Sequence, residues 1–214
     1  MMKVPLYPVI EYLDLTSVQK VIETKTERTY MDVANWKEFP YKPIAVVDVA
    51  RTREALYISF YNKGMSLKAQ HTTDGSPVHK DSCVEFFMKT VDSPTYINFE
   101  FNCIGVCNAA HRLSREESTP FTPKEYATIE RCTSIPPAKR DGSLNEKENL
   151  AWNLLVKIPF TTMGLDPDFL PEKIMVNFYK CADGTKYPHF LSWSPIDLPN
   201  PDFHCPQFFG ELYL

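Results

Sequence analysis

The chain is poor in glycine and has no long apolar run. Its 214 residues include seven glycines against 18 prolines. Proline lacks a backbone donor and breaks helix interiors, so this composition argues against long helices. No apolar stretch approaches the roughly 20 residues that a membrane-spanning helix needs. Because Pro5, Pro8, Glu11 and Asp14 interrupt the N-terminus, it also lacks a signal-peptide core. We expect no membrane partner and a cytoplasmic protein, or a secreted or periplasmic one if the sequence is trimmed.

The chain also lacks a strong excess of either charge. It has 23 basic and 27 acidic residues, a formal net charge of -4, and the two signs are interspersed. No basic stripe is available to neutralise a nucleic-acid backbone, so nucleic acid is excluded as an expected partner. The length and the 43% hydrophobic content suit one large β domain as well as two small ones. We expect a single domain over residues 1–214, with a leading segment at 1–30.

The sequence contains none of the common hydrolase or metalloprotease motifs. There is no G-x-S-x-G and no H-E-x-x-H among its five histidines. The six cysteines are spread through a chain of ordinary domain size, and we expect them to be reduced. Cys103 and Cys107 lie four residues apart, but no second close pair completes a zinc site. We therefore expect buried thiols and no metal.

Short runs of β-branched, aliphatic and aromatic residues predict strands along most of the chain. Polar turn signals separate several of them, such as the Arg51-Thr52-Arg53-Glu54 and Asp92-Ser93-Pro94-Thr95 segments. This spacing favours an all-β fold, an antiparallel β-sandwich of immunoglobulin-like or jelly-roll type. The strands are expected at residues 44–49, 55–61, 84–88, 96–103, 150–158, 174–180, 190–193 and 210–214.

Two regions depart from this pattern. Residues 11–27 have apolar positions at loose spacing and fit either a short helix or an irregular leading strand. Residues 111–149 are polar and rich in turn formers, which predicts a long irregular excursion with short structured pieces around 126–132. Long loops on a rigid scaffold carry function more often than packing.

Alternation sorts the residues of the strand expected at 96–103 into two faces. Apolar side chains occupy one face, and Tyr96, Asn98, Glu100 and Asn102 occupy the other. Such a row of hydrogen-bonding groups suits sugar hydroxyls, although an ordinary solvated sheet face has the same pattern. In the preceding strand, adjacent Phe86 and Phe87 cannot both point into one core. One of them is expected to meet a second layer or line a pocket.

The C-terminal fifth places rings on a loop with three prolines at 195, 199 and 201. Each proline fixes its own φ and biases the residue before it towards extended geometry, so the loop should keep its shape. The aromatic and imidazole groups of Phe203 and His204 follow directly. A rigid loop that carries rings is suited to stacking on a flat ligand.

Several short motifs follow one another in a set order along the chain, namely Asp81-Ser82-Cys83-Val84-Glu85-Phe86-Phe87, Asn98-Phe99-Glu100-Phe101-Asn102, Ser192-Trp193-Ser194 and Phe209-Gly210. Their order and spacing resemble those of family 9 carbohydrate-binding modules, a DOMON-like β-sandwich family, over residues 30–214. The resemblance implies non-catalytic binding of a mono- or oligosaccharide between two aromatic side chains, with amide, carboxylate and guanidinium groups on its hydroxyls.

Matching these motifs by position gives a set of implied binding residues. The two clamp positions fall at His79 and Phe203, where the family has tryptophans, and Glu100 stands where the family has an arginine. We expect weaker stacking from these smaller rings. Trp193 ends a strand and is predicted to pack rather than to bind. The implied set is His79, Glu85, Asn98, Glu100, Asn200 and Phe203, followed by Arg112, Lys180, Trp193 and His204.

Three alternatives to binding remain open from the sequence. Glu85 and Glu100 could act as the carboxyl pair of a glycoside hydrolase or glycosidase-associated domain. A haem-binding redox sandwich could use His79 and Met65 as axial ligands. A purely structural role would follow if the clamp were closed. No cofactor is expected, because Ser93-Pro94-Thr95 stands where the family's structural calcium would require acidic residues.

Overall fold

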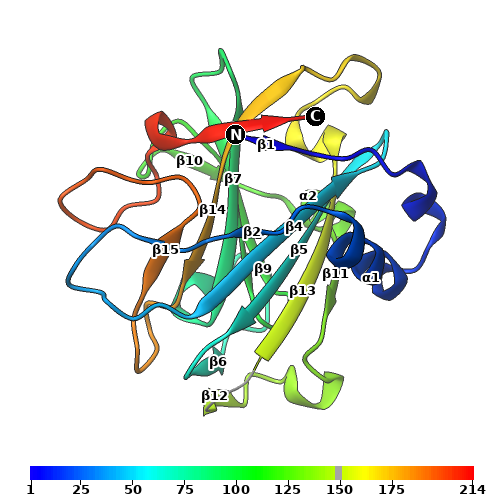
Figure 1. Ribbon diagram of the computed structural model, residues 1–214. Coiled ribbons are helices and arrows are strands. Elements are labelled where there is room, and N and C mark those ends of the chain that lie inside the picture. The colour runs from blue at the N-terminus through cyan, green and yellow to red at the C-terminus, as the bar shows by residue number, and fades with distance from the viewer. Residues whose placement is uncertain (148–150) are drawn as a thin grey trace.

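The computed structural model describes residues 1–147 and 151–214, which form two large β-sheets packed face to face (Figure 1). The larger sheet has the order β1-β16-β14-β7-β8-β9-β10, with β15 beside β14 and β3 beside β15. Its pairs are antiparallel except β1 with β16. The strands are β1 (Met2–Lys3), β3 (Val33–Ala34), β7 (Cys83–Thr90), β8 (Tyr96–Asn102), β9 (Cys107–Arg112), β10 (Ser118–Pro120), β14 (Lys173–Cys181), β15 (Phe190–Ser192) and β16 (Gly210–Tyr213).

The second sheet has five antiparallel strands in the order β11-β13-β5-β4-β2, and a separate pair joins β12 to β6. Strands β4 and β5 form a long hairpin, and the Thr52 hydroxyl stabilises its turn by accepting hydrogen bonds from the amides of Glu54 and Ala55. The strands are β2 (Thr29–Tyr30), β4 (Ile44–Arg51), β5 (Ala55–Lys63), β6 (Leu67–Ala69), β11 (Glu130–Thr133), β12 (Leu144–Lys147) and β13 (Ala151–Pro159).

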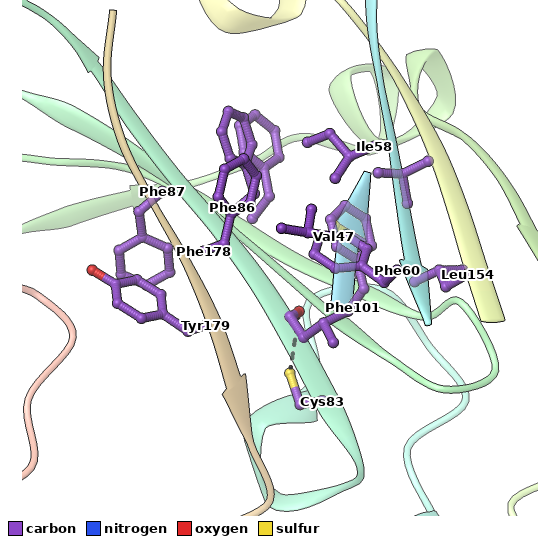
Figure 2. Packing of buried hydrophobic residues seen from close by; sticks show 14 of the residues in the cluster. Val47, Ile58, Phe60, Cys83, Phe86, Phe87, Phe101, Leu154, Phe178 and Tyr179 are labelled. Carbon is purple, nitrogen blue, oxygen red and sulfur yellow. Dashed lines mark hydrogen bonds between the residues drawn. The ribbon is translucent and has the colours of Figure 1, made fainter. Parts of the chain in front are cut away.

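Aromatic rings from both sheets fill the space between them. Phe86 stacks on Phe178 at a centroid distance of 5.3 Å, and Phe178 meets Phe60 of the other sheet at 6.5 Å. Figure 2 shows these rings beside Val47 and Ile58, whereas Phe87 lies on the opposite side of β7. The expectation that Phe86 and Phe87 serve different layers is thus confirmed, and so is the antiparallel sandwich.

Helices occupy the edges of this framework. Helix α1 (Leu15–Lys25) resolves the alternatives for residues 11–27, and Asp14 caps its N-terminus by accepting from the Ser17 amide. The helix covers the outer face of the five-stranded sheet, where Val18 and Ile22 pack near Tyr57. No helix of the described residues is long and apolar enough to cross a membrane. The other helices are α2 (Pro123–Thr128), η1 (Pro8–Tyr12), η2 (Val78–Lys80), η3 (Pro137–Lys139), η4 (Phe160–Met163), η5 (Pro167–Phe169) and η6 (Pro206–Phe208).

The main difference from the predicted elements lies between residues 107 and 147. Strand β9 was not predicted, and the expected excursion contains β10, α2, β11 and β12, with β11 paired to the sandwich along β13. Short strands with polar side chains carry little alternation, which is why the sequence predicts no more than short structured pieces around 126–132. Helix α2 and strand β11 occupy that stretch. The predicted strand start at residue 150 and the end of the excursion at 148–149 lie outside the described residues. All six cysteines are free thiols, as expected.

Candidate functional site

The C-terminal loop, defined here as residues 193–209, is held by side chains from the early part of the chain. The indole Nε1 of Trp36 donates to the carbonyl of Leu198 at 2.9 Å, and the amide oxygen of Asn35 accepts from the Ile196 N–H at 2.8 Å. Farther along the loop, Phe203 stacks on Tyr179 with ring centroids 4.1 Å apart. These contacts hold the loop over the outer face of the nine-stranded sheet, away from the sandwich core.

Beneath the loop, the polar row of β8 is buried and internally hydrogen-bonded. The Glu100 carboxylate accepts from Asn98 at 2.8 Å and from Asn108 of β9 at 3.0 Å. Arg112, also on β9, donates from its Nε to the Asn98 side-chain oxygen at 2.6 Å. Glu100 is 5% exposed and Asn98 is fully buried, so the solvated-face interpretation of this row is wrong. Buried polar groups that satisfy one another form a rigid platform.

A cavity of about 350 Å³ lies between this platform and the C-terminal loop. We call it the outer cavity. Strands β7, β8, β9 and β14 supply its floor, and the loop supplies one wall. The structure brings six of the ten predicted residues to its lining, namely His79, Glu85, Glu100, Arg112, Phe203 and His204. Asn98 does not line it but connects Arg112 to Glu100 from behind.

Four predicted positions do not line the outer cavity. Asn200 is exposed on the loop, because the chain presents residues 201–204 to the cavity instead. Alternation along β14 turns Lys180 inward, where its Nζ lies 6.0 Å from the Trp152 ring. Trp193 meets Phe178 edge to face and lies against Gly210, which confirms the packing prediction for it. Asn200 and Lys180 therefore lie outside the lining of the outer cavity, and Asn98 supports its floor from behind.

The two carboxyl groups of the floor occupy different electrostatic environments. Glu85 and Glu100 are direct cross-strand neighbours on β7 and β8. Burial and the nearby Glu100 charge raise the pKa of Glu85 well above its usual range. Burial also opposes ionisation of Glu100, but the nearby His79 and the hydrogen bond from Asn108 prevail and lower its pKa. Glu100 is thus a charged acceptor, and Glu85 is a neutral group that can donate.

Two histidines that line the cavity also have pKa values shifted in opposite directions. The Glu100 carboxylate, 3.8 Å from the Nδ1 of His79, raises the pKa of that imidazole. His204 instead has its Nδ1 2.9 Å from the Tyr96 hydroxyl and packs on Phe87. Burial, together with the Arg112 charge, lowers the pKa of His204 to about 4. A charged and a neutral imidazole therefore line one cavity at moderately acidic pH.

The buried imidazole of His204 makes a pH-dependent contribution to stability. In the unfolded chain, this histidine takes up a proton near pH 6.5, whereas the folded protein resists protonation down to about pH 4. Below pH 6.5 the unfolded state therefore binds more protons, and folding is penalised by up to about 1.4 kcal/mol per pH unit. We expect the unfolding free energy of wild type relative to His204→Gln to fall between pH 6.5 and 5 in urea titrations. A difference independent of pH would contradict this assignment.

Several lining residues have no counterpart in the sequence prediction. Asn108 comes from the unpredicted strand β9, and Arg115 from the turn that follows it. Arg115 forms a 3.1 Å ion pair with Asp202 and so ties this turn to the C-terminal loop. Asp183, just beyond β14, completes the polar rim. Period two places Asn108 and Arg112 on one face of β9, but Ala110 stands between them, so no alternation of polar and apolar residues marked this strand in the sequence.

Calcium ligation does not fit the turn at residues 93–95. The Ser93 hydroxyl donates to the Thr95 carbonyl and accepts from the Thr95 amide, so the oxygens of this turn satisfy one another. Calcium prefers six to eight oxygens with several carboxylates. Within residues 1–147 and 151–214, one cluster alone brings three potential metal-ligating side chains together, and it consists of Cys83, Glu85 and Cys181.

The fold and the cavity define a β-sandwich with a polar, ring-lined binding site on one sheet face, and comparison with known proteins is consistent with that class. The model of carbohydrate-binding family 9 matches residues 17–214. The chain therefore belongs to carbohydrate-binding family 9, which confirms the resemblance and the expected carbohydrate-binding function. No curated protein matches the chain at a significant level.

Solved structures show the same fold. A protein from Bacteroides uniformis ATCC 8492, provisionally described as carbohydrate-binding, superposes with a TM-score of 0.90 at 30% identity, covering 99% of this chain and 97% of that one. A family 9 module from Caldicellulosiruptor kristjanssonii in complex with glucose gives 0.61 at 11% identity, covering 99% and 94%. Its complex with cellotriose gives 0.63 at 10% identity, covering 99% and 92%.

Proposed function

We propose that the outer cavity binds a mono- or oligosaccharide without hydrolysing it. The observation that carries this proposal is the ionised Glu100 carboxylate, held by two amides and His79 at the base of a cavity walled by Phe203. Sugar hydroxyls need acceptors and donors fixed in space, and the apolar faces of the sugar ring need a flat neighbour. Glu100 supplies the acceptor, while Arg112 and protonated Glu85 supply donors.

The guanidinium that the family resemblance implies is present, but it comes from a different strand. Glu100 of β8 stands at the expected position, and Arg112 of β9 lines the same cavity. Besides its bond to Asn98, Arg112 donates from Nη1 to the Arg115 carbonyl at 2.8 Å, and the two bonds fix the plane of its guanidinium. A guanidinium held in this way presents directional donors to neighbouring hydroxyls. Arg112 of β9 can therefore supply the guanidinium donors that the family has at the position of Glu100.

Hydrolysis is disfavoured by where the two carboxyl groups lie. Directly opposed residues of an antiparallel pair have Cβ atoms about 4.5–5.5 Å apart and point to the same side of the sheet. A glycosidase instead places its carboxyl groups on either side of the scissile bond. Glu85 also accepts a hydrogen bond from the Cys181 thiol at 2.9 Å, which holds it in the floor. Binding is thus the activity that this geometry supports.

Haem ligation by His79 and Met65 is not supported either. His79 lines the outer cavity, whereas Met65 does not line it and is 40% exposed beyond the end of β5. The side chain of His79 is already engaged with Glu100. A haem iron needs both axial ligands on one cavity.

Isothermal titration calorimetry with glucose, xylose, cellobiose and cellotriose tests the proposed binding. His79→Ala should weaken the binding of the recognised sugar at least tenfold, a change of about 1.4 kcal/mol, because it removes a half-exposed ring from the cavity wall. His111→Ala is the matched control, since His111 also pairs with a glutamate but lies outside the cavity. Absence of binding at millimolar sugar across the panel, or equal binding by His79→Ala, would refute the proposal.

A further inference from the structure

Two thiols and a carboxyl group converge in the floor of the outer cavity. Cys83 of β7 and Cys181 of β14 are directly opposed in the antiparallel register, and Glu85 follows two residues along β7 on the same face. Their three ligand atoms lie within 4.8 Å of one another. None of the three residues is more than 3% exposed. The pairing of two long central strands fixes these positions, so the cluster is preformed.

We propose that Cys83, Cys181 and Glu85 form a Zn²⁺ site with one coordination position open to the outer cavity. Zinc accepts thiolate and carboxylate ligands in tetrahedral geometry, and sites with three protein ligands keep the fourth position for a small molecule. At a Zn–S length of about 2.3 Å, tetrahedral ligand atoms lie roughly 3.8 Å apart. The spacing within the cluster accommodates that geometry with small side-chain adjustments.

Lys180 is a buried cation next in sequence to Cys181, with its side chain on the opposite, inner face of β14. Lys180 is 3% exposed, and its ammonium donates to the Cys181 carbonyl at 2.7 Å. No ion pair among the described residues includes Lys180. Burial lowers the pKa of Lys180, and the nearby Cys181, Cys83, Cys103 and Glu85 act in the opposite direction. A buried ammonium without an anionic partner is costly.

Zinc binding would correct this charge imbalance. Two thiolates and one carboxylate around Zn²⁺ give a complex with a net charge of -1, which places an anionic charge one residue along β14 from Lys180. Thiols must lose their protons to bind zinc. Metal binding therefore releases protons from the cluster as it supplies that anionic charge.

The route to the site is the sugar cavity itself. Glu85 and Cys181 line the outer cavity, whereas Cys83 lies behind them. The open coordination position therefore faces the same volume as His79 and Glu100. A bound water or a sugar hydroxyl can occupy it. This inference goes beyond sugar binding, and in the zinc-bound protein Glu85 is a metal ligand, so that Arg112 is left as the donor to the sugar. The test contains no sugar, so either proposal can fail while the other holds.

Cobalt titration of the intact, reduced and chelator-treated protein tests the site. We expect one equivalent of Co²⁺ to produce thiolate-to-cobalt charge-transfer absorption in the near ultraviolet, and Zn²⁺ to abolish it by displacement. Cys181→Ser should weaken cobalt binding at least a hundredfold, and Cys83→Ser/Cys181→Ser should remove the absorption. Cys107→Ser is the matched control, because Cys107 is a fully buried thiol outside the cluster, and it should bind cobalt as wild type does.

A second measurement uses the wild-type protein alone, so it does not depend on whether the substituted proteins fold. Zn²⁺ should raise the melting temperature of the wild-type protein in a concentration-dependent way, whereas Mg²⁺ should not. The proposal is overturned if reduced protein shows neither cobalt absorption nor a zinc-dependent shift. It is equally overturned if the absorption persists in the double variant, since the thiolates would then come from elsewhere.

Discussion

Replacement of Trp36 by alanine is expected to lower the free energy of unfolding by about 3–5 kcal/mol, the usual cost of removing a buried tryptophan. Trp36 is 3% exposed and packs against Phe190 and Phe203 at centroid distances of 6.3 and 6.1 Å. Its indole also satisfies the Leu198 carbonyl, which the substitution would leave without that donor. Sugar affinity should fall as well, because the C-terminal loop loses its attachment to the sandwich.

Urea denaturation of the variant and of wild type measures this loss. Trp36→Phe should cost less, because it keeps most of the ring packing and loses only the indole donor. Phe169→Ala serves as the surface control, since that ring is 82% exposed and its removal should change stability by less than about 0.5 kcal/mol. An unfolding midpoint of Trp36→Ala equal to that of wild type would show that the loop is held by other contacts.

Glu100→Ala is expected to reduce affinity for the recognised sugar more than a hundredfold, or about 2.7 kcal/mol. The substitution removes the charged acceptor and leaves the amides of Asn98 and Asn108 without their partner. Hydrogen bonds to charged groups contribute about 1.5–3 kcal/mol each, more than neutral ones. The freed amides would also rearrange the platform on which Arg112 rests.

Calorimetry with Glu100→Gln separates charge from shape. Glutamine keeps the size of the side chain but is neutral, so its affinity should lie between those of wild type and Glu100→Ala. Glu27→Ala, at an exposed position, is the control for a general change in charge. Circular dichroism should confirm that each variant is folded. Affinity of folded Glu100→Ala within twofold of wild type would place the sugar elsewhere.

The strand framework was predictable because its core follows period two. Phe99 and Phe101 alternate with Asn98 and Glu100, and this pattern gives both the strand and the face that carries the polar row. The same rule places Lys180 with Phe178 on the inner face of β14, so its exclusion from the cavity could have been inferred from the sequence.

The remaining parts of the site depend on contacts between distant segments. Trp36 and Leu198 are 162 residues apart, and Arg115 meets Asp202 across two loops. No local pattern encodes such pairings. Position matching along the C-terminal loop likewise predicted Asn200 as a ligand, because the number of residues between motifs does not reveal which of them turns towards a cavity. Burial of Glu85 beside two thiols required the strand register.

The attachment of the C-terminal loop at Trp36 and Asn35 has a kinetic consequence. A loop fixed before the ligand arrives incurs little ordering cost on association, and complexes of this kind form without a slow conformational step. Stopped-flow traces at excess sugar would then follow a single exponential whose rate rises linearly with concentration. Release of the loop by Trp36→Ala would introduce a second phase that becomes independent of sugar concentration.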